Sequence, residues 1–281
     1  MTVPFHYGRK PLRMSPSQSR VSPQPMVVAI DGPAGAGKST VARMLANRLG
    51  VPYLDTGAMY RAVGLLAMRD GLVSPFSEDD ESALTELAEG HTIELAGTGA
   101  SVTVLIDGED VSDAIRTPEC ALMASAVSAV SGVRCALVPI QRRIGLERGG
   151  VMEGRDIGSV VFPDATLKVF LTASSDERAK RRQLDLHDQG IETTVDDVKQ
   201  QQHQRDLQDT SRADSPLHVA EGSVVVDTTG STLDEVVERL LSELETFNHL
   251  RLDTNGENTI RSRNHGGLVR GKSAPIEEES S

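Results

Sequence analysis

Residues 32–39 are the stretch of this chain with the clearest chemistry, and they read Gly-Pro-Ala-Gly-Ala-Gly-Lys-Ser. They fit the pattern G-x-x-x-x-G-K-[ST] without a mismatch. Glycines in such a loop let backbone N–H groups approach phosphate oxygens, and the N-terminus of the following helix adds positive charge. Lys38 can then reach the outer phosphates of a nucleoside triphosphate, and the hydroxyl of Ser39 can bind Mg²⁺. The residues predicted to hold the triphosphate are Gly32, Pro33, Ala34, Gly35, Ala36, Gly37, Lys38, Ser39 and Thr40.

A phosphate loop does not by itself say how the phosphate is used. A GTPase would need an Asn-Lys-x-Asp tetrapeptide, which the sequence lacks. A motor or transporter ATPase would need an apolar strand ending in Asp after the loop, but VAID precedes the loop and VVVD comes late in the chain. A small kinase would need an acceptor pocket and arginines that neutralise charge. A regulator that binds a nucleotide without catalysis is the alternative from another class of protein.

A first group of acceptor candidates follows the second predicted strand. Asp55, Thr56 and Gly57 end that strand, and Tyr60 and Arg61 lie in the first turns of the next helix. In a doubly wound sheet this edge lies beside the phosphate loop, where ligands bind. Arg61 is therefore placed to hold an anionic acceptor, although a surface ion pair would be an ordinary alternative. Tyr60 could pack on the acceptor's sugar, and Asp55 could orient Mg²⁺ through water.

A second group repeats the combination of arginine and aspartate. Arg155 and Asp156 come directly after a buried strand, so they lie at the same edge of the sheet. Arg205, Asp209 and Arg212 fall at i, i+4 and i+7, which places them on one face of a helix. Such a face is usually a surface stripe of ion pairs. The combination of Arg and Asp recurs near a predicted phosphate site, however, and this favours a role in substrate binding.

Three more arginines occur on the helix that leads into this region. Arg178, Arg181 and Arg182 are candidates to close over the triphosphate, and Arg181 is the one we assign to ATP. Catalysis would then consist of alignment and charge neutralisation, with Lys38, Arg61 and Arg155 as the central residues.

The elements that must position these residues alternate between buried strands and amphipathic helices. This alternation predicts an α/β fold with a parallel sheet covered by helices on both faces, in three layers. Capping boxes at Ser174-x-x-Glu177 and Thr232-x-x-Glu235 open two of the helices. The predicted strands are 26–31, 52–55, 150–153, 166–172 and 223–228, and the first helices are 38–49 and about 58–69.

Two stretches interrupt the alternation. Residues 74–148 carry a hairpin signal and three helical segments, which predicts an inserted subdomain. Residues from about 183 to 216 are highly polar and predict a mobile helical lid. We expect one domain over residues 25–248, with disordered tails at 1–24 and 249–281.

Composition excludes several classes of protein. The 281 residues carry a formal charge of −12, so the chain lacks the basic surface of a non-specific nucleic-acid or membrane binder. Cys120 and Cys135 have no metal or redox spacing and predict two reduced thiols. No apolar run approaches the roughly 18 residues of a membrane helix, and no secretory signal opens the chain. We expect a cytoplasmic protein, a monomer, without nucleic-acid or membrane partners.

Five segments in order resemble the bacterial cytidylate kinases. They are DGPAGAGKST, LDTGAMYR, EGRDIGSVVFPDA, RD-x-x-D-x-x-R and DTTGSTLDEVV, and the resemblance runs from about residue 26 to residue 246. It implies a P-loop nucleoside monophosphate kinase that uses ATP, Mg²⁺ and CMP, with dCMP as a second acceptor. The insertion would bind the monophosphate. Gln208 stands where some members of the family carry another arginine. Another small-molecule P-loop kinase is the alternative within enzymes.

The resemblance also assigns roles to individual residues. Arg61, Arg155 and Arg212 would hold the CMP phosphate, and Arg205 and Asp209 would hold the pentose near Tyr60. Ser125, Arg134 and Asp156 would read the cytosine. The full set implied for CMP is Thr56, Tyr60, Arg61, Ser125, Arg134, Arg155, Asp156, Arg205, Asp209 and Arg212.

Overall fold

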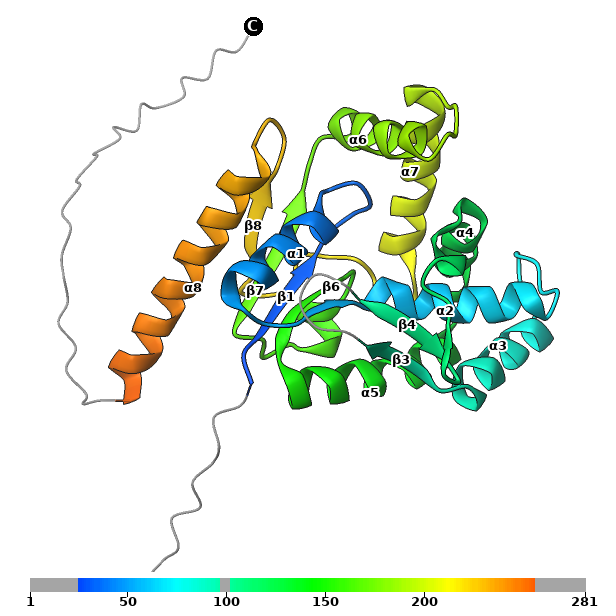
Figure 1. Ribbon diagram of the computed structural model, residues 1–281, viewed down its shortest axis with the longest axis horizontal. Coiled ribbons are helices and arrows are strands. Elements are labelled where there is room, and N and C mark those ends of the chain that lie inside the picture. The colour runs from blue at the N-terminus through cyan, green and yellow to red at the C-terminus, as the bar shows by residue number, and fades with distance from the viewer. Residues whose placement is uncertain (1–24, 97–101, 256–281) are drawn as a thin grey trace, which may run out of the picture.

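The centre of the protein is a five-stranded sheet with helices on both faces (Figure 1). The computed structural model describes residues 25–96 and 102–255. All neighbouring strands of this sheet run parallel, which confirms the predicted fold class. The strands in spatial order are β2 (Tyr53–Asp55), β6 (Gly150–Gly154), β1 (Val27–Asp31), β7 (Leu167–Thr172) and β8 (Val224–Asp227).

The helices alternate with the strands as the sequence predicts, with small differences at their ends. The helix expected from about residue 58 begins at Thr56, because the side chain of Asp55 accepts a hydrogen bond from the backbone N–H of Ala58 at 3.0 Å. The helices are α1 (Lys38–Leu49), α2 (Thr56–Arg69), α3 (Glu78–Gly90), α4 (Pro118–Val127), α5 (Ser131–Arg148), α6 (Ser175–Asp188), α7 (Val195–Ser211) and α8 (Leu233–Asn255), with a 3₁₀ turn η1 (Ala114–Arg116) and a π-helix η2 (Ile157–Val161).

Alternate side chains of β1 enter two separate hydrophobic cores. Val28 and Ile30 pack with α1 and α8, whereas Val27 and Ala29 pack with α2 and α5. Successive residues of a strand point to opposite faces of the sheet. Because both faces are covered, β1 is apolar at every position before Asp31, and Asp31 ends it at the edge where ligands bind.

The insertion packs against α2 and shares its core with the main sheet. It contains a small antiparallel sheet of β3 (Ile93–Ala96), β4 (Thr103–Ile106) and β5 (Glu109–Asp110), together with α3, α4 and α5. The predicted hairpin is confirmed, and the Gly-rich turn within it lies partly outside the described residues. The insertion therefore rests directly on the helix that carries Tyr60 and Arg61.

The predicted lid, from about residue 183, covers the end of α6 and all of α7. The lid begins earlier than predicted, because the whole of α6 packs with α7 around a small core of their own. Ala179, Leu186 and Val198 are buried between the two helices. One expectation is wrong in detail: α7 ends at Ser211, so Arg212 follows the helix and does not lie within it. Its backbone has already left the helical conformation, with φ −56° and ψ 139°.

The last helix is longer than the sequence predicted. We expected a tail from residue 249, but α8 continues to Asn255; residues 1–24 and 256–281 lie outside the described part of the chain. Within the described residues, no single helix is long and apolar enough to cross a membrane; α4 and α5 meet that test only as a pair bent by 100°.

Candidate active site

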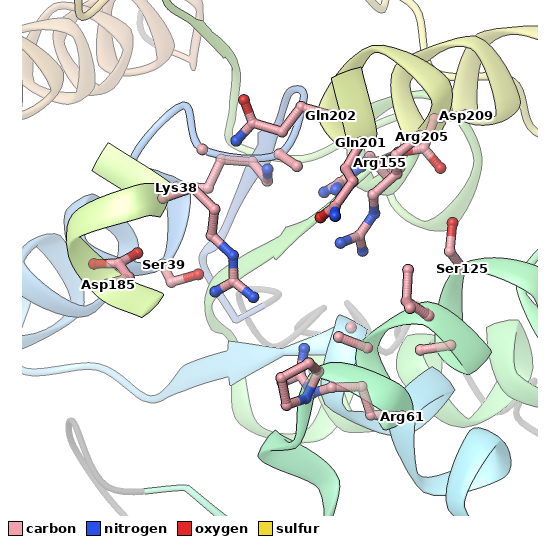
Figure 2. A pocket seen from close by; sticks show the side chains of 18 of the residues that line it. Lys38, Ser39, Arg61, Ser125, Arg155, Asp185, Gln201, Gln202, Arg205 and Asp209 are labelled. Atoms are coloured by element: carbon pink, nitrogen blue, oxygen red, sulfur yellow. Dashed lines mark hydrogen bonds and ion pairs between the residues drawn. The ribbon is translucent and has the colours of Figure 1, made fainter. Parts of the chain in front are cut away.

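A large cavity opens along the carboxyl edge of the parallel sheet. Its volume is about 1470 Å³, and it lies between the phosphate loop, the insertion and the lid. Figure 2 shows Lys38 and Ser39 on one side of it, Arg61 and Ser125 on another, and the lid residues Arg205 and Asp209 near Arg155. The structure thus brings residues from five separate segments of the sequence to one cavity.

The phosphate loop is held open by backbone that only glycine can adopt. Gly32 has a φ of 147°, and a Cβ atom there would lie 2.0 Å from the carbonyl oxygen of Leu171. Lys38 folds back over the loop, and its Nζ donates to the carbonyl oxygen of Pro33 at 2.7 Å. Burial and the nearby charge of Arg155 lower the pKa of Lys38. An anion entering the loop would relieve that repulsion.

Glu153 is a candidate residue that the sequence reasoning missed. Its Oε2 accepts a hydrogen bond from the Ser39 hydroxyl at 3.0 Å, and its Oε1 accepts one from the Tyr53 hydroxyl. The side chain is buried at the end of β6, and burial together with the charge of Asp55 raises its pKa. A signal for it existed, since residues 151–153 are an apolar strand ending in an acid after the loop. The acid that ends this strand is Glu, whereas the pattern considered above has Asp.

Asp55, which we expected to orient Mg²⁺, has both carboxylate oxygens engaged elsewhere. Oδ1 caps α2 by accepting from the N–H of Ala58, and Oδ2 pairs with Nη2 of Arg61 at 2.6 Å. Arg61 therefore reaches the cavity with a carboxylate partner already in place. The Nε atom of Arg61 is buried and has no hydrogen-bond partner.

A cluster of arginines surrounds one buried carboxylate at the base of the lid. Asp209 accepts from Nε of Arg155 at 2.7 Å and from Nη2 of Arg212. Burial opposes its charge, but Arg155 and Arg212 hold the pKa of Asp209 below its usual value. Burial and the charge of Arg155 lower the pKa of Arg205 to about 10, and its buried Nε has no partner. Repulsion of this kind favours the binding of phosphate oxygens.

A second buried pair forms the corner of the cavity nearest the insertion. Nη2 of Arg134 on α5 donates to Oδ2 of Asp156, and both residues are 4% exposed. The Arg134 guanidinium lies 5.5 Å from the centre of the Tyr60 ring. Burial raises the pKa of Tyr60 to about 12, although the charge of Arg134 opposes this. The Tyr60 ring thus makes a cation–π contact with Arg134, which the sequence did not predict.

Ser125 and Thr56 complete the predicted set for the acceptor. Ser125 lines the cavity from α4, and its hydroxyl donates to Oε1 of Gln208 on the lid at 3.3 Å. Thr56 also lines the cavity, and its hydroxyl donates to the backbone carbonyl of Glu153 at 2.7 Å. Nη1 of Arg212 reaches the carbonyl oxygen of Ser128 at 3.5 Å. The lid and the insertion therefore meet at this corner.

The three lid arginines occupy different surroundings. Arg178 is buried, pairs with Asp206 at 2.7 Å and donates to the carbonyl oxygen of Ala34 in the phosphate loop at 3.1 Å. Arg181, our candidate for ATP, lines the cavity but is held by Glu177 and by Thr228, at 2.9 Å from each. Arg182 also lines the cavity, and among the described residues it has no hydrogen-bond or ion-pair partner.

The oxygen atoms near Ser39 suit Mg²⁺ delivered with a nucleotide. Among the described residues no cluster of three or more His, Cys, Asp or Glu could hold a metal by itself. Ser39 and Glu153 instead place one hydroxyl and one carboxylate side by side. Mg²⁺ typically keeps several waters and takes few ligands from the protein, with phosphate oxygens completing its shell.

The chain is similar in sequence to known kinases. A sequence profile described as Cytidylate kinase matches residues 28–246. A cytidylate kinase of Geobacter sp. (strain M21) is 49% identical over 213 residues, covering 76% of this chain and 90% of that protein. One of Caldanaerobacter subterraneus subsp. tengcongensis is 46% identical over 230 residues, covering 82% and 96%. A solved gluconokinase from Sinorhizobium meliloti 1021 covers 82% of this chain and 98% of its own, with 16% identity and a TM-score of 0.42.

Proposed function

The chain belongs to the cytidylate kinase family, and on that premise we propose that it transfers the γ-phosphoryl group of ATP to CMP, giving ADP and CDP. The observation that carries the proposal is the meeting of a complete phosphate loop with the Arg134–Asp156 pair and the Asp209 arginine cluster at one cavity. The first would hold the donor, and the other two would hold an anionic acceptor that carries a hydrogen-bonding base.

The transfer requires no general base. A phosphate monoester is largely dianionic at neutral pH, so the CMP phosphate is already a nucleophile. One of its oxygens forms a bond to the γ-phosphorus, and the bond from that phosphorus to the β–γ bridging oxygen breaks as ADP leaves. Catalysis then depends on alignment and on neutralising the charge of the transferring group. Lys38 and the cavity arginines supply that charge.

We assign the CMP phosphate to Arg61, Arg155 and Arg212. Each is paired with a carboxylate, either Asp55 or Asp209. A phosphate accepts the same charge-assisted hydrogen bonds as a carboxylate, often in bidentate form. The arginines would therefore be held near their working positions before CMP arrives, and binding would exchange or extend their contacts.

We assign the pentose to Arg205 and Asp209 and the base to Ser125, Arg134 and Asp156. Cytosine offers an exocyclic amine as a donor, with ring N3 and O2 as acceptors. A carboxylate and a hydroxyl suit the amine, and an arginine suits the acceptors. Uracil presents an acceptor where cytosine has the amine, so its carbonyl oxygen would face the Asp156 carboxylate and supply no hydrogen bond to it beyond the one from Arg134.

We assign the Mg²⁺ that accompanies ATP to Ser39 and Glu153. The bound ion would neutralise charge on the outer phosphates. The Ser39 hydroxyl, which now donates to Glu153 at 3.0 Å, would turn its oxygen toward the ion, and the Glu153 carboxylate would accept hydrogen bonds from the ion's waters. This assignment replaces Asp55, whose two oxygens hold Ala58 and Arg61.

We assign both Arg181 and Arg182 to the triphosphate. Arg181 lines the cavity with a carboxylate partner, Glu177, as the arginines of the CMP phosphate do, and Arg182 lines it without a hydrogen-bond or ion-pair partner among the described residues. Closure of α6 and α7 would then exclude water and suppress hydrolysis of ATP. Use of dCMP as an acceptor, a monomeric state and a cytoplasmic location remain predictions.

The test is the release of ADP from MgATP with each acceptor supplied alone. We expect rapid release with CMP, slower release with UMP, AMP and shikimate, and almost none without an acceptor. Lys38→Ala is the control, and it should fold as the wild type does but lose nearly all turnover. Release of ADP that is independent of CMP, or that Lys38→Ala retains, would contradict the proposed function.

A further inference from the structure

Asp31 joins the phosphate loop to the segment that carries the acceptor residues. It is the last residue of β1, directly before Gly32, and it is 4% exposed. Its Oδ1 accepts a hydrogen bond from the backbone N–H of Ile157 at 2.8 Å, and its Oδ2 accepts one from the N–H of Gly158 at 2.7 Å. One carboxylate thus holds two consecutive amides from a part of the chain more than 120 residues away.

These two amides open η2, the π-helix that immediately follows Arg155 and Asp156. A π-helix is rare and occurs mostly at functional sites. The carbonyl oxygen of Asp156 accepts from the N–H groups of Val160 at 2.8 Å and Val161 at 3.1 Å, so Asp156 belongs to the same hydrogen-bonded turn. Asp31 therefore holds the start of the turn that directly follows Arg155 and Asp156, the residues of this segment that line the cavity.

The surroundings of Asp31 leave little freedom to replace this contact. A Cβ atom on Gly158 would lie 3.4 Å from Oδ2 of Asp31 and 3.2 Å from side-chain carbons of Lys168. The amide groups of residues 157 and 158 are buried with the carboxylate. Without Asp31 they would be left unsatisfied, which costs about 1–3 kcal/mol for each group.

We propose that Asp31 is a positioning residue for the acceptor: through its bidentate contact with η2 it sets the placement of Arg155 and Asp156, and thereby CMP affinity and the preference for cytosine over uracil. The inference rests on the proposed function. Asp31 acts through the backbone and does not itself contact a substrate.

We expect the contact between Asp31 and η2 to have little effect on ATP binding. The Lys38 charge lowers the pKa of Asp31, but the charges that act most on Lys38 itself are those of Arg155, Glu153, Arg205 and Asp209. Both carboxylate oxygens of Asp31 accept from N–H groups of η2, and among the described residues neither accepts from the phosphate loop. Replacing it should therefore disturb CMP binding selectively.

The experiment compares Asp31→Asn with the wild type in the full chain. An amide keeps the shape of the side chain but offers only one acceptor oxygen and presents a donor to the second N–H. We expect KM for CMP to rise on the order of 10-fold to 100-fold, the scale for misplaced positioning groups. KM for ATP should stay within about 2-fold, and the CMP/UMP ratio of kcat/KM should fall.

Ser159→Ala is the matched control. It changes a side chain in the same π-helix, whose hydroxyl makes no hydrogen bond, and leaves the Asp31 contact intact. This variant should behave as the wild type does. The amide proton resonances of Ile157 and Gly158 should shift in Asp31→Asn and remain in place in Ser159→Ala, which reports the contact independently of activity.

Three results would overturn the inference. They are an equal rise of KM for ATP and CMP, unchanged CMP kinetics despite shifted amide resonances, and an effect of Ser159→Ala as large as that of Asp31→Asn. If Asp31→Asn does not fold, hydrogen exchange on the wild type decides: the Ile157 and Gly158 amides must be protected before CMP is added, and unprotected exchange refutes the preformed contact. Failure of the proposed function is distinguishable, because wild-type enzyme would then show no CMP-dependent turnover.

Discussion

At the scale of single residues, several arginines of the site form ion pairs with aspartates. Arg61 pairs with Asp55, Arg155 pairs with Asp209, and Arg134 pairs with Asp156. An isolated buried charge is costly, and a pair that is also hydrogen-bonded offsets that cost. The pairs hold long, flexible side chains in fixed geometry before the substrates bind. This is preorganisation of the kind on which electrostatic catalysis depends.

Glu153→Gln tests the acid beside Ser39. The amide keeps the volume but removes the charge, so we expect the Mg²⁺ concentration for half-maximal rate to rise about 10-fold to 100-fold, the scale for residues that orient a metal's ligands. Binding of Mn²⁺ in the presence of ADP, followed by electron paramagnetic resonance, reports affinity without turnover. Asp55→Asn is the comparison. If Asp55→Asn weakens Mn²⁺ binding and Glu153→Gln does not, our first assignment of Asp55 was correct and that of Glu153 is wrong.

Asp156→Asn tests base recognition. The amide can donate to the uracil oxygen that the carboxylate repels, so the preference for CMP over UMP should narrow by about 1–3 kcal/mol, the usual scale for an unsatisfied buried group. Arg61→Ala is the contrast, because it removes a contact to the phosphate that all acceptors share and should lower kcat for each of them alike. Values of kcat/KM for both acceptors decide the matter. If the CMP/UMP ratio of kcat/KM is unchanged in Asp156→Asn, Asp156 does not take part in base recognition.

At the scale of elements, the lid is tied to the rest of the site by its arginines. Arg178 links α6 to the phosphate loop through the carbonyl of Ala34 and to α7 through Asp206. Three residues further along α7, Asp209 pairs with Arg155, which directly follows β6. The start of α6 and the end of α7, which meet at the Arg178–Asp206 pair, are therefore anchored both to the phosphate loop and to an acceptor residue.

Asp209 gives this anchoring a dependence on pH. Although burial alone would raise its pKa, Arg155 and Arg212 hold that pKa below the value of about 3.9 found in unfolded chains. The stability it contributes is therefore fully present above about pH 4 and is lost as the pH falls through the lower native pKa. Asp209→Asn should be less stable by about 3–5 kcal/mol near pH 7, the cost of breaking a buried pair.

Urea unfolding of both proteins, followed by circular dichroism between pH 7 and pH 3, measures this difference. The gap between them should shrink in the acid range, because the wild type alone loses the contribution of this carboxylate. A gap that stays constant down to pH 3 would show that Asp209 is not held in its charged form by the arginines.

The elements also show what could be predicted from the sequence and what could not. Contiguous signals predicted the phosphate loop, the buried strands and the capping box at Thr232 correctly. At Ser174 only half of the predicted capping box forms, because the Ser174 N–H donates to Thr229 and the Glu177 side chain pairs with Arg181.

The Glu153–Ser39 contact and the Asp31–η2 contact join residues more than 110 positions apart. No local pattern indicates either contact, although the apolar strand that ends in an acid does mark Glu153 itself. The π-helix could not be predicted from the sequence for another reason: no feature of the segment IGSVV distinguishes a π-helix from a loop. Ser125 came from family resemblance alone, and the structure places it at the cavity.

At the scale of the whole molecule, the described fold extends beyond the domain predicted over residues 25–248. A chain cut at residue 248 would end inside α8, whereas one of residues 25–255 keeps the complete helix. We expect the chain of residues 25–255 to match the full chain in Tm and in kcat for CMP. Side-by-side thermal melts and turnover assays of the three chains test this. A clear loss in the chain of residues 25–255 would show that a segment outside the described residues contributes to the fold or the site.

The central claim is that one cavity moves a phosphoryl group from ATP to cytidine monophosphate in preference to other acceptors. Competition tests it most directly: equal concentrations of CMP, UMP and GMP with limiting MgATP, and chromatographic separation of the nucleoside diphosphates at low conversion. The product ratio equals the ratio of kcat/KM values, free of differences between assays. The account predicts that CDP exceeds UDP and GDP each by roughly 10-fold or more, the scale for one unsatisfied buried hydrogen-bonding group. Equal yields of the three products, or ADP formed without any other diphosphate, would contradict it.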